Sequence, residues 1–292
     1  MHGRPPQPAR RRFLKRSFAG GVLGLGVYAF GIEPRWLEVT SHEIQIPGLD
    51  SRLDGATAVH FSDTHIGSRV GDDYIRRQLN YISSLQPDFV FFTGDFLDCA
   101  SDWHREKGRQ MLPSFPKGKI GTACVFGNHD YLDSDRHDRK IVSGEVTRSL
   151  QEDFAEHDIK ILIDETVEFD GLRIAGLRDY WYGGFNNRSA AKAIAKVSDG
   201  PSIVLSHNPD TADLPIWKNY NSWVLSGHTH GGQCTFPLLG APILPVKNKD
   251  YVSGKYEIAA GHRMFINRGI GHTHRVRFMA RPEITVLTLR SS

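Results

Sequence analysis

The chain has 292 residues, enough for one large domain with a well-buried core or for two small ones. Its 39% hydrophobic and 24% charged residues are typical of a soluble globular protein. The net charge of +3 comes from the N-terminus, because residues 1–16 hold six basic residues and no acid. The remainder carries 30 basic and 33 acidic residues, which gives it a net charge of −3. That balance disfavours a nuclease, and no specific nucleic-acid partner is expected.

The N-terminal segment has the pattern of a targeting signal. Residues 10–15 read R-R-R-F-L-K, which resembles the twin-arginine export signal, and a mostly apolar stretch follows over 17–32. That stretch is short for a membrane span, which needs about 20 apolar residues. We therefore assign residues 1–33 to a twin-arginine signal or possible membrane anchor. The alternative is a basic tail before a buried helix.

This assignment predicts a location. The twin-arginine (Tat) export machinery would be a partner, and the protein would reach the periplasm or cell exterior, or stay anchored in the inner membrane.

Apolar runs and polar segments alternate along the body. Helices are predicted at 74–85, where Ile75, Leu79 and Ile82 have helical spacing, and at 141–157. Strands are predicted at 56–62, 88–93, 121–126, 159–163, 166–169, 172–176, 202–205, 222–225, 263–266 and 284–289. The pattern indicates an α/β protein with two packed sheets flanked by helices.

Potential metal ligands follow several of these strands. The blocks are D-T-H at 63–65, G-D-F-L-D at 94–98, G-N-H-D at 127–130, S-H at 206–207 and G-H-T-H at 227–230. Open α/β sheets place their ligand sites beyond the carboxyl ends of strands. Each block is weak evidence alone, but the ordered set predicts a metal site.

The residue types indicate the chemistry. A phosphodiester is an anion that repels hydroxide, and a bound divalent metal lowers the pKa of its water to about 7. A second metal about 3.5–4 Å away can clamp both the nucleophile and the phosphoryl oxygens. A mixture of Asp and His suits two transition metals (Mn, Fe or Zn) better than Ca or Mg.

These blocks resemble the calcineurin-like metallophosphoesterases, whose motifs are D-x-H, G-D-x-x-D, G-N-H-D/E, H and G-H-x-H. The resemblance implies a four-layer α/β/β/α sandwich of two mixed β-sheets, with residues 34–292 as the phosphoesterase domain. It also implies a hydroxide between the metals as the nucleophile. The implied ligands are Asp63, His65 and His230 for the first metal, Asn128, His207 and His228 for the second, and Asp95 as the bridge.

The resemblance also implies a catalytic pair beside the metals. His129 would act on the scissile phosphate as a general acid or stabilising cation, and Asp98 would orient His129 and keep it charged.

A second G-H-T-H block occupies 271–274. Nearby arginines, among them Arg268, suit a phosphate better than a dication. We expect Arg268 and His129 to bind substrate, and 271–274 to be a substrate-side loop or otherwise a surface turn. Trp181 is a candidate for the cleft lining, and 237–245 is a candidate for an apolar cleft wall or for loop packing.

The ending R-P-E-I-T-V-L-T-L at 281–289, N-R-G-I-G at 267–271 and S-G-H-T-H-G-G-Q at 226–233 are similar to bacterial exported or membrane-associated phosphodiesterases of this family. We expect a phosphodiester or pyrophosphate substrate, because Cys99-Ala100 stands where protein phosphatases carry Arg-Gly. A lipid-linked phosphoester is one form that such a substrate would take. Some relatives cleave UDP-diacylglucosamine in lipid A synthesis, which is one alternative. Another is a membrane-associated binding module that retains the metal cage.

Overall fold

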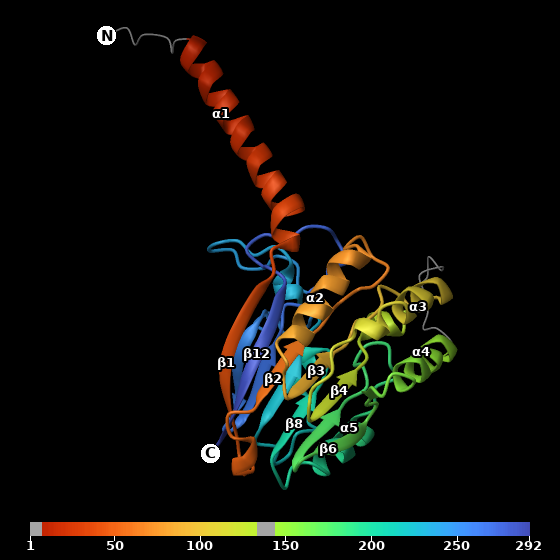
Figure 1. Ribbon diagram of the computed structural model, residues 1–292. Coiled ribbons are helices and arrows are strands. Elements are labelled where there is room, and N and C mark those ends of the chain that lie inside the picture. Colours follow the sequence, from red (N-terminus) through yellow and green to blue (C-terminus); the bar gives the residue numbers. More distant parts are fainter. Residues whose placement is uncertain (1–7, 133–143) are drawn as a thin grey trace.

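Two six-stranded β-sheets pack face to face between helices in the computed structural model, which describes residues 8–132 and 144–292 (Figure 1). The first seven residues of the predicted signal and residues 141–143 of the predicted helix 141–157 lie outside the described residues.

The first sheet has the order β1-β12-β2-β3-β4-β5. Its strands are β1 (Glu38–Ile46), β12 (Glu283–Ser291), β2 (Thr57–Phe61), β3 (Phe89–Thr93), β4 (Gly121–Val125) and β5 (Lys160–Ile161). Neighbours are parallel except β12 and β2.

The second sheet has the order β10-β11-β9-β8-β7-β6. Its strands are β10 (Gly254–Ala259), β11 (His262–Ile266), β9 (Trp223–Ser226), β8 (Ser202–Leu205), β7 (Leu172–Gly176) and β6 (Glu165–Phe169). The edge strands β10 and β6 are antiparallel to their neighbours, so both sheets are mixed.

Helices cover both outer faces. Helices α2 (Asp72–Ser84), α3 (Asp102–Arg109) and α4 (Glu145–Ala155) lie on the first sheet, and α5 (Asn187–Ala195) lies on the second. Short helical segments are η1 (Tyr28–Ile32), η2 (Glu33–Arg35), η3 (Ser51–Leu53), η4 (Leu112–Ser114), η5 (Asn128–Asp130), η6 (Pro209–Asp213) and η7 (His230–Gly232). The predicted four-layer α/β/β/α sandwich is confirmed.

Strand β3 explains why the buried strands read as continuous apolar runs. Successive side chains of a strand point to opposite faces of the sheet. Phe89 and Phe91 therefore enter the core between the sheets, whereas Val90 and Phe92 enter the core beneath the outer helices. With both faces buried, the central strands are held rigidly, and the carboxyl ends of β2, β3, β4, β8 and β9 meet along one edge.

Several elements were not predicted. Strands β1 and β10 alternate exposed and half-buried residues along most of their length, and α3 and α5 are short, so their apolar patterns are weak. The predicted strand 159–163 shrinks to two residues, Lys160–Ile161.

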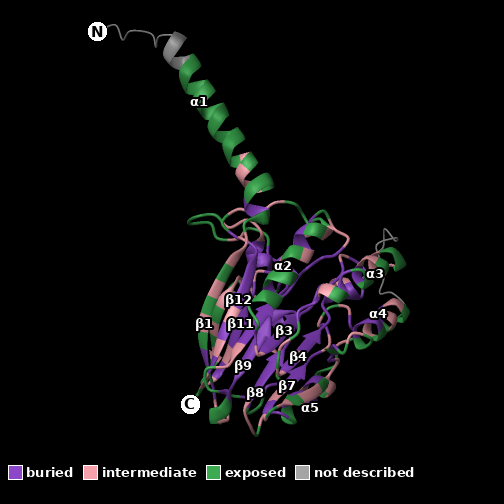
Figure 2. Cartoon of the chain, in the orientation of Figure 1, coloured by how far each residue is buried: buried purple, intermediate pink, exposed green. Residues whose placement is uncertain are grey.

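In the described part of the N-terminal segment, α1 (Pro8–Val27) projects away from the body, and most of its side chains over 12–27 are exposed (Figure 2). In the part of the chain that the structure describes, no helix has both the length and the apolar character that a membrane crossing requires.

Candidate metal centre

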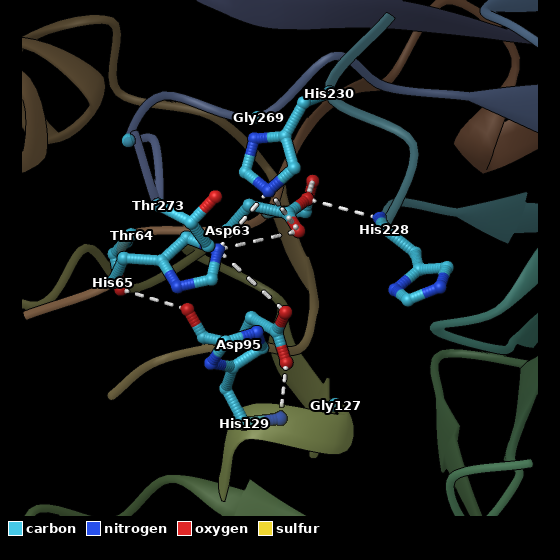
Figure 3. Close-up of polar contacts among 12 residues, drawn as sticks. Asp63, Thr64, His65, Asp95, Gly127, His129, His228, His230, Gly269 and Thr273 are labelled. Atoms are coloured by element: carbon cyan, nitrogen blue, oxygen red, sulfur yellow. Dashed lines mark hydrogen bonds and ion pairs between the residues drawn. The ribbon is translucent and has the colours of Figure 1, made fainter. Parts of the chain in front are cut away.

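The seven predicted metal ligands converge at the shared carboxyl edge of the two sheets. Figure 3 shows five of them, namely Asp63, His65, Asp95, His228 and His230. They form two buried groups, in each of which one ligand atom per residue lies within 4.8 Å of the others. The groups are Asp63, His65 and His230, and Asp95, His207 and His228. Asn128 joins the second group, because its Oδ1 lies 3.1 Å from His207 Nε2.

Most of these side chains leave their strands through an unusual backbone conformation. Five of the seven residues have positive φ angles, at 53° for Asp63, 45° for His65, 57° for Asp95, 72° for His228 and 51° for His230. A non-glycine residue in this region costs of order 1–3 kcal/mol, and such residues cluster at functional sites. The sharp turns aim side chains from separate strands at one point.

Glycines beside the ligands allow the strand ends to approach closely. A Cβ atom on Gly127 would lie 2.2 Å from Asp95 Oδ1 and 2.7 Å from His207 Cε1. A Cβ atom on Gly94, whose φ is 90°, would lie 2.5 Å from the Gly127 nitrogen. The glycines of the G-D and G-N blocks are therefore required by packing around Asp95.

Asp95, a member of the second group, also faces the first. Its Oδ2 is 3.6 Å from His65 Nε2 in the first group and 3.3 Å from His207 Nε2 in the second. Its Oδ1 accepts a hydrogen bond from the backbone nitrogen of His129 at 2.9 Å. This bond fixes the carboxylate so that Oδ2 faces both groups.

Partners outside the centre orient three of the histidine rings. His207 Nδ1 is 2.7 Å from the Thr93 carbonyl oxygen, His228 Nε2 is 2.6 Å from the Pro245 carbonyl oxygen, and His65 Nδ1 is 3.2 Å from Asp98 Oδ1. In each ring the opposite nitrogen then faces the centre. Metal-binding histidines commonly have such an outer acceptor, which fixes the tautomer and leaves a lone pair for the metal.

The carboxylates of the centre favour a positive charge on His207. Burial alone would lower the pKa of His207, but the carboxylates of Asp95 and Asp63 raise it to about 10. Burial would raise the pKa of Asp95, yet the adjacent His207 and His129 hold it well below its usual range. A centre that attracts a proton this strongly would also attract a cation, and coordination would displace the proton from the imidazole.

The residues present fit a divalent metal. Asp63 Oδ1 is buried without a hydrogen-bond partner, and it lies 3.4 Å from His230 Nε2. A buried unpaired carboxylate oxygen is costly unless a cation or donor satisfies it. Carboxylate, imidazole and amide ligands together suit a transition metal.

A third group, His65, Asp98 and His129, also lies within 4.8 Å. Asp98 and His129 thus lie together as predicted, but the geometry of their contact differs from the predicted one. The Asp98 carboxylate faces His65 rather than His129, and His129 Nδ1 instead lies 2.5 Å from the Asp98 main-chain oxygen. Asp98 thus orients His129 through its backbone, and its side chain orients a candidate metal ligand.

The predicted substrate contact of Arg268 is not supported. Its guanidinium donates to Glu283 at 3.0 Å and to Glu38 at 2.8 Å, and Arg268 does not line the cavity over the centre. Arg277 is fully buried and donates to the main-chain oxygens of Gly271 and Ala280 at 2.6 and 2.7 Å. These arginines stabilise the loop behind His230 and are not a phosphate clamp.

A cavity of about 880 Å³ opens over the centre. Asp95, Asn128, His228 and His230 form part of its lining, together with His129. One wall is aromatic and apolar, and its members include Trp181, Tyr182, Pro242, Ile243 and Pro245. Trp181 and part of the stretch 237–245 therefore lie where the cleft lining was predicted.

The second G-H-T-H block divides between the cavity and the core. Thr273 and His274 line the cavity, whereas His272 is buried, and burial lowers its pKa to about 3. The predicted substrate-side position is thus supported for two of its residues. The lining also contains three residues that were not predicted from the sequence, Leu132, Tyr182 and Gln233, although Gln233 directly follows the first G-H-T-H-G-G run.

We predict that Gly127→Ala weakens metal binding, because the added methyl group would displace Asp95 or His207. Metal affinity should fall by about 10–100-fold, the range typical of disturbed ligand support. Titration with Mn²⁺ followed by calorimetry would measure the loss. Gly144→Ala is the matched control, since nothing lies within 4 Å of its added Cβ. Equal affinities for the two variants would contradict this account of the glycine.

Comparison with known proteins agrees with the geometry. Residues 56–232 match the family described as calcineurin-like phosphoesterase. The chain is 31% identical to the uncharacterized metallophosphoesterase YkuE of Bacillus subtilis, over 97% of this chain and 98% of that protein. It is 27% identical to the phosphodiesterase YaeI of Escherichia coli, over 96% and 99% of the two chains. It is also 27% identical to the UDP-2,3-diacylglucosamine pyrophosphatase LpxG of Chlamydia muridarum, over 89% and 92%.

The family predicted from the sequence motifs is confirmed, and with it the class of phosphoric ester hydrolases whose members bind divalent metals. The chain belongs to the calcineurin-like phosphoesterase family.

Proposed function

We propose that this protein hydrolyses phosphodiester or pyrophosphate bonds with two divalent transition metals. Asp63, His65 and His230 would hold one metal. Asn128, His207 and His228 would hold the other, with Asp95 shared between them. The position of Asp95 Oδ2 carries the proposal, because this oxygen lies 3.6 Å from His65 Nε2 and 3.3 Å from His207 Nε2.

When bound, the metals would supply a nucleophile at neutral pH and neutralise charge on the phosphoryl oxygens. The chain's own contribution comes from His129, which lines the cavity beside the centre. Because Nδ1 faces the Asp98 carbonyl oxygen, Nε2 carries a proton only in the imidazolium form. Burial lowers the pKa of His129, and the nearby Asp95 carboxylate opposes that effect. His129 would donate its Nε2 proton to the leaving oxygen or to the phosphoryl group.

The metals are proposed to be Mn, Fe or Zn, since carboxylate and imidazole ligands in mixture favour these ions over Ca and Mg.

A lipid-linked pyrophosphate, such as UDP-diacylglucosamine, is the second candidate substrate. The wall formed by Pro242, Ile243 and Pro245 favours it, because this wall gives an apolar group a surface next to the centre. LpxG is a pyrophosphatase of such a substrate, and the similarity covers most of both chains.

We predict different losses for two substitutions in the centre. Asp95→Asn removes the shared carboxylate, so metal content and hydrolysis of an aryl phosphodiester should both fall, hydrolysis by more than about 100-fold. His129→Gln should retain the metals and lose about 10²–10⁴-fold in kcat.

Elemental analysis and steady-state kinetics would measure both effects, with His262→Gln as a control at a buried histidine outside the centre. Unchanged turnover in the Asp95→Asn protein would rule out the mechanism.

We also propose that the twin-arginine pathway exports the protein, on the basis of the R-R-R-F-L-K segment at 10–15. Replacing Arg10 and Arg11 with lysine keeps the charge but removes the arginine pair. The variant should remain in the cytoplasm, as cell fractionation would show. Export at the level of the unchanged protein would disprove the assignment.

A further inference from the structure

An apolar loop over residues 236–243 (the apolar loop) extends into solvent beside the cavity. Leu238, Leu239 and Ile243 are exposed by 106%, 81% and 78%. Among the large hydrophobic side chains that the structure describes, these three are the most exposed. A single exposed leucine is unremarkable, but a contiguous apolar patch marks a contact surface.

The conformation of the apolar loop is held by its own hydrogen bonds. The Phe236 nitrogen donates to the Gly240 oxygen at 2.8 Å, and the Gly240 nitrogen donates to the Phe236 oxygen at 2.9 Å. Leu238 has a φ of 71°, which is unfavourable for a bulky residue. The loop thus maintains a strained turn that exposes the Leu238 side chain to solvent. An exposed leucine side chain adds nothing to the free energy of folding.

The apolar loop is continuous with the base of α1. The Phe278 ring contacts Phe236 at 5.3 Å and Tyr28 at 6.2 Å between centroids, and the Arg277 nitrogen donates to the Ala29 oxygen at 3.0 Å. Figure 1 shows α1 leaving the body at this same end. Along α1 and the segment after it, further apolar side chains are exposed, including Phe18, Leu23, Leu25, Phe30, Ile32 and Trp36.

The sequence segments around this apolar surface are rich in basic residues, although Asp210 and Asp213 contact residues 247–248 and the exposed Asp250 follows them. No acidic residue occurs within 234–249 or 258–282, and Lys247, Lys249 and Arg275 are exposed there. The N-terminal segment likewise has no acid before Glu33. The body as a whole is net acidic, so these basic segments are a local feature. Basic residues around exposed apolar groups favour an anionic lipid surface, at about 1 kcal/mol per Lys or Arg near the surface.

The apolar loop also borders the candidate metal centre. Pro242 and Ile243 line the cavity, and the Pro245 oxygen that follows lies 2.6 Å from His228 Nε2. Ile243 is thus both exposed to solvent and part of the cavity wall. A molecule embedded in a lipid surface could therefore reach the centre while its apolar part stays in contact with protein or lipid.

We propose that the apolar loop docks the protein on an anionic lipid surface and admits an amphiphilic phosphoester from that surface to the centre. The evidence for docking is the exposed leucines and the local charge. The entry of the phosphoester from the lipid surface to the centre rests on the proposed function.

Sedimentation with lipid vesicles tests the docking. The full chain should bind vesicles of phosphatidylethanolamine and phosphatidylglycerol more tightly than vesicles of phosphatidylcholine. Leu238→Glu/Leu239→Glu should lower the partition coefficient by at least about tenfold, since two leucine side chains no longer enter the lipid.

Tyr81→Glu/Leu85→Glu is the matched control, at residues 41% and 37% exposed near the far end of α2, and it should bind as the unchanged protein does. All three proteins should hydrolyse a soluble aryl phosphodiester equally, which also shows that each is folded. Hydrolysis of a phosphodiester carried by a vesicle lipid should fall for the Leu238→Glu/Leu239→Glu protein alone.

The docking would be overturned if the unchanged protein did not bind vesicles, or if the Leu238→Glu/Leu239→Glu protein bound them equally well. A dimer that this substitution dissociates, without any loss of vesicle binding, would make the loop a contact between copies of the chain and would also overturn it. Entry of the phosphoester from the lipid surface is contradicted if the Leu238→Glu/Leu239→Glu protein binds vesicles less tightly but hydrolyses the vesicle-borne phosphodiester as fast as the unchanged protein. Absence of hydrolysis in every protein would contradict the proposed function only, because vesicle binding needs no turnover.

Discussion

The close approach of five strand ends is the constraint on which the rest of the structure depends. Asp63, Asp95 and His228 each leave a buried strand with positive φ, a conformation that costs free energy and persists only where the surroundings enforce it. The phenylalanines of β3 provide that enforcement, because they fill the core on both faces of the first sheet. Gly94 and Gly127 then leave room for Asp95 between the two histidine groups. The packing of the core therefore determines the geometry of the site.

The electrostatic arrangement follows from the same approach. Burial raises the pKa of Asp63, whereas the neighbouring histidines lower that of Asp95, and the carboxylates raise that of His207 to about 10. These opposed shifts arise because buried charges have few water molecules to screen them. A bound cation would stabilise the buried carboxylates of the centre, and this is the physical reason to treat it as a metal centre.

The sequence could predict the elements whose patterns are local. Buried strands such as β3 read as apolar runs, and the ligand blocks follow them directly, so the fold and the convergence of the seven residues were predictable. Contacts between segments that are distant in the sequence were not predictable. The Asp98 carboxylate faces His65 rather than His129, and Arg268 is bound by Glu38 and Glu283, because tertiary packing sets these directions. The half-exposed strand β1 was missed because its pairing with β12, not its own pattern, makes it a strand.

One carboxylate is proposed to serve two metals, and a crystal structure of the Mn²⁺-loaded protein with anomalous scattering would show whether it does. Two anomalous peaks per chain are expected, one within coordinating distance of Asp63, His65 and His230, and one within coordinating distance of Asn128, His207 and His228. Asp95 should contact both ions. A single ion at full occupancy, or two ions of which Asp95 binds one, would contradict it.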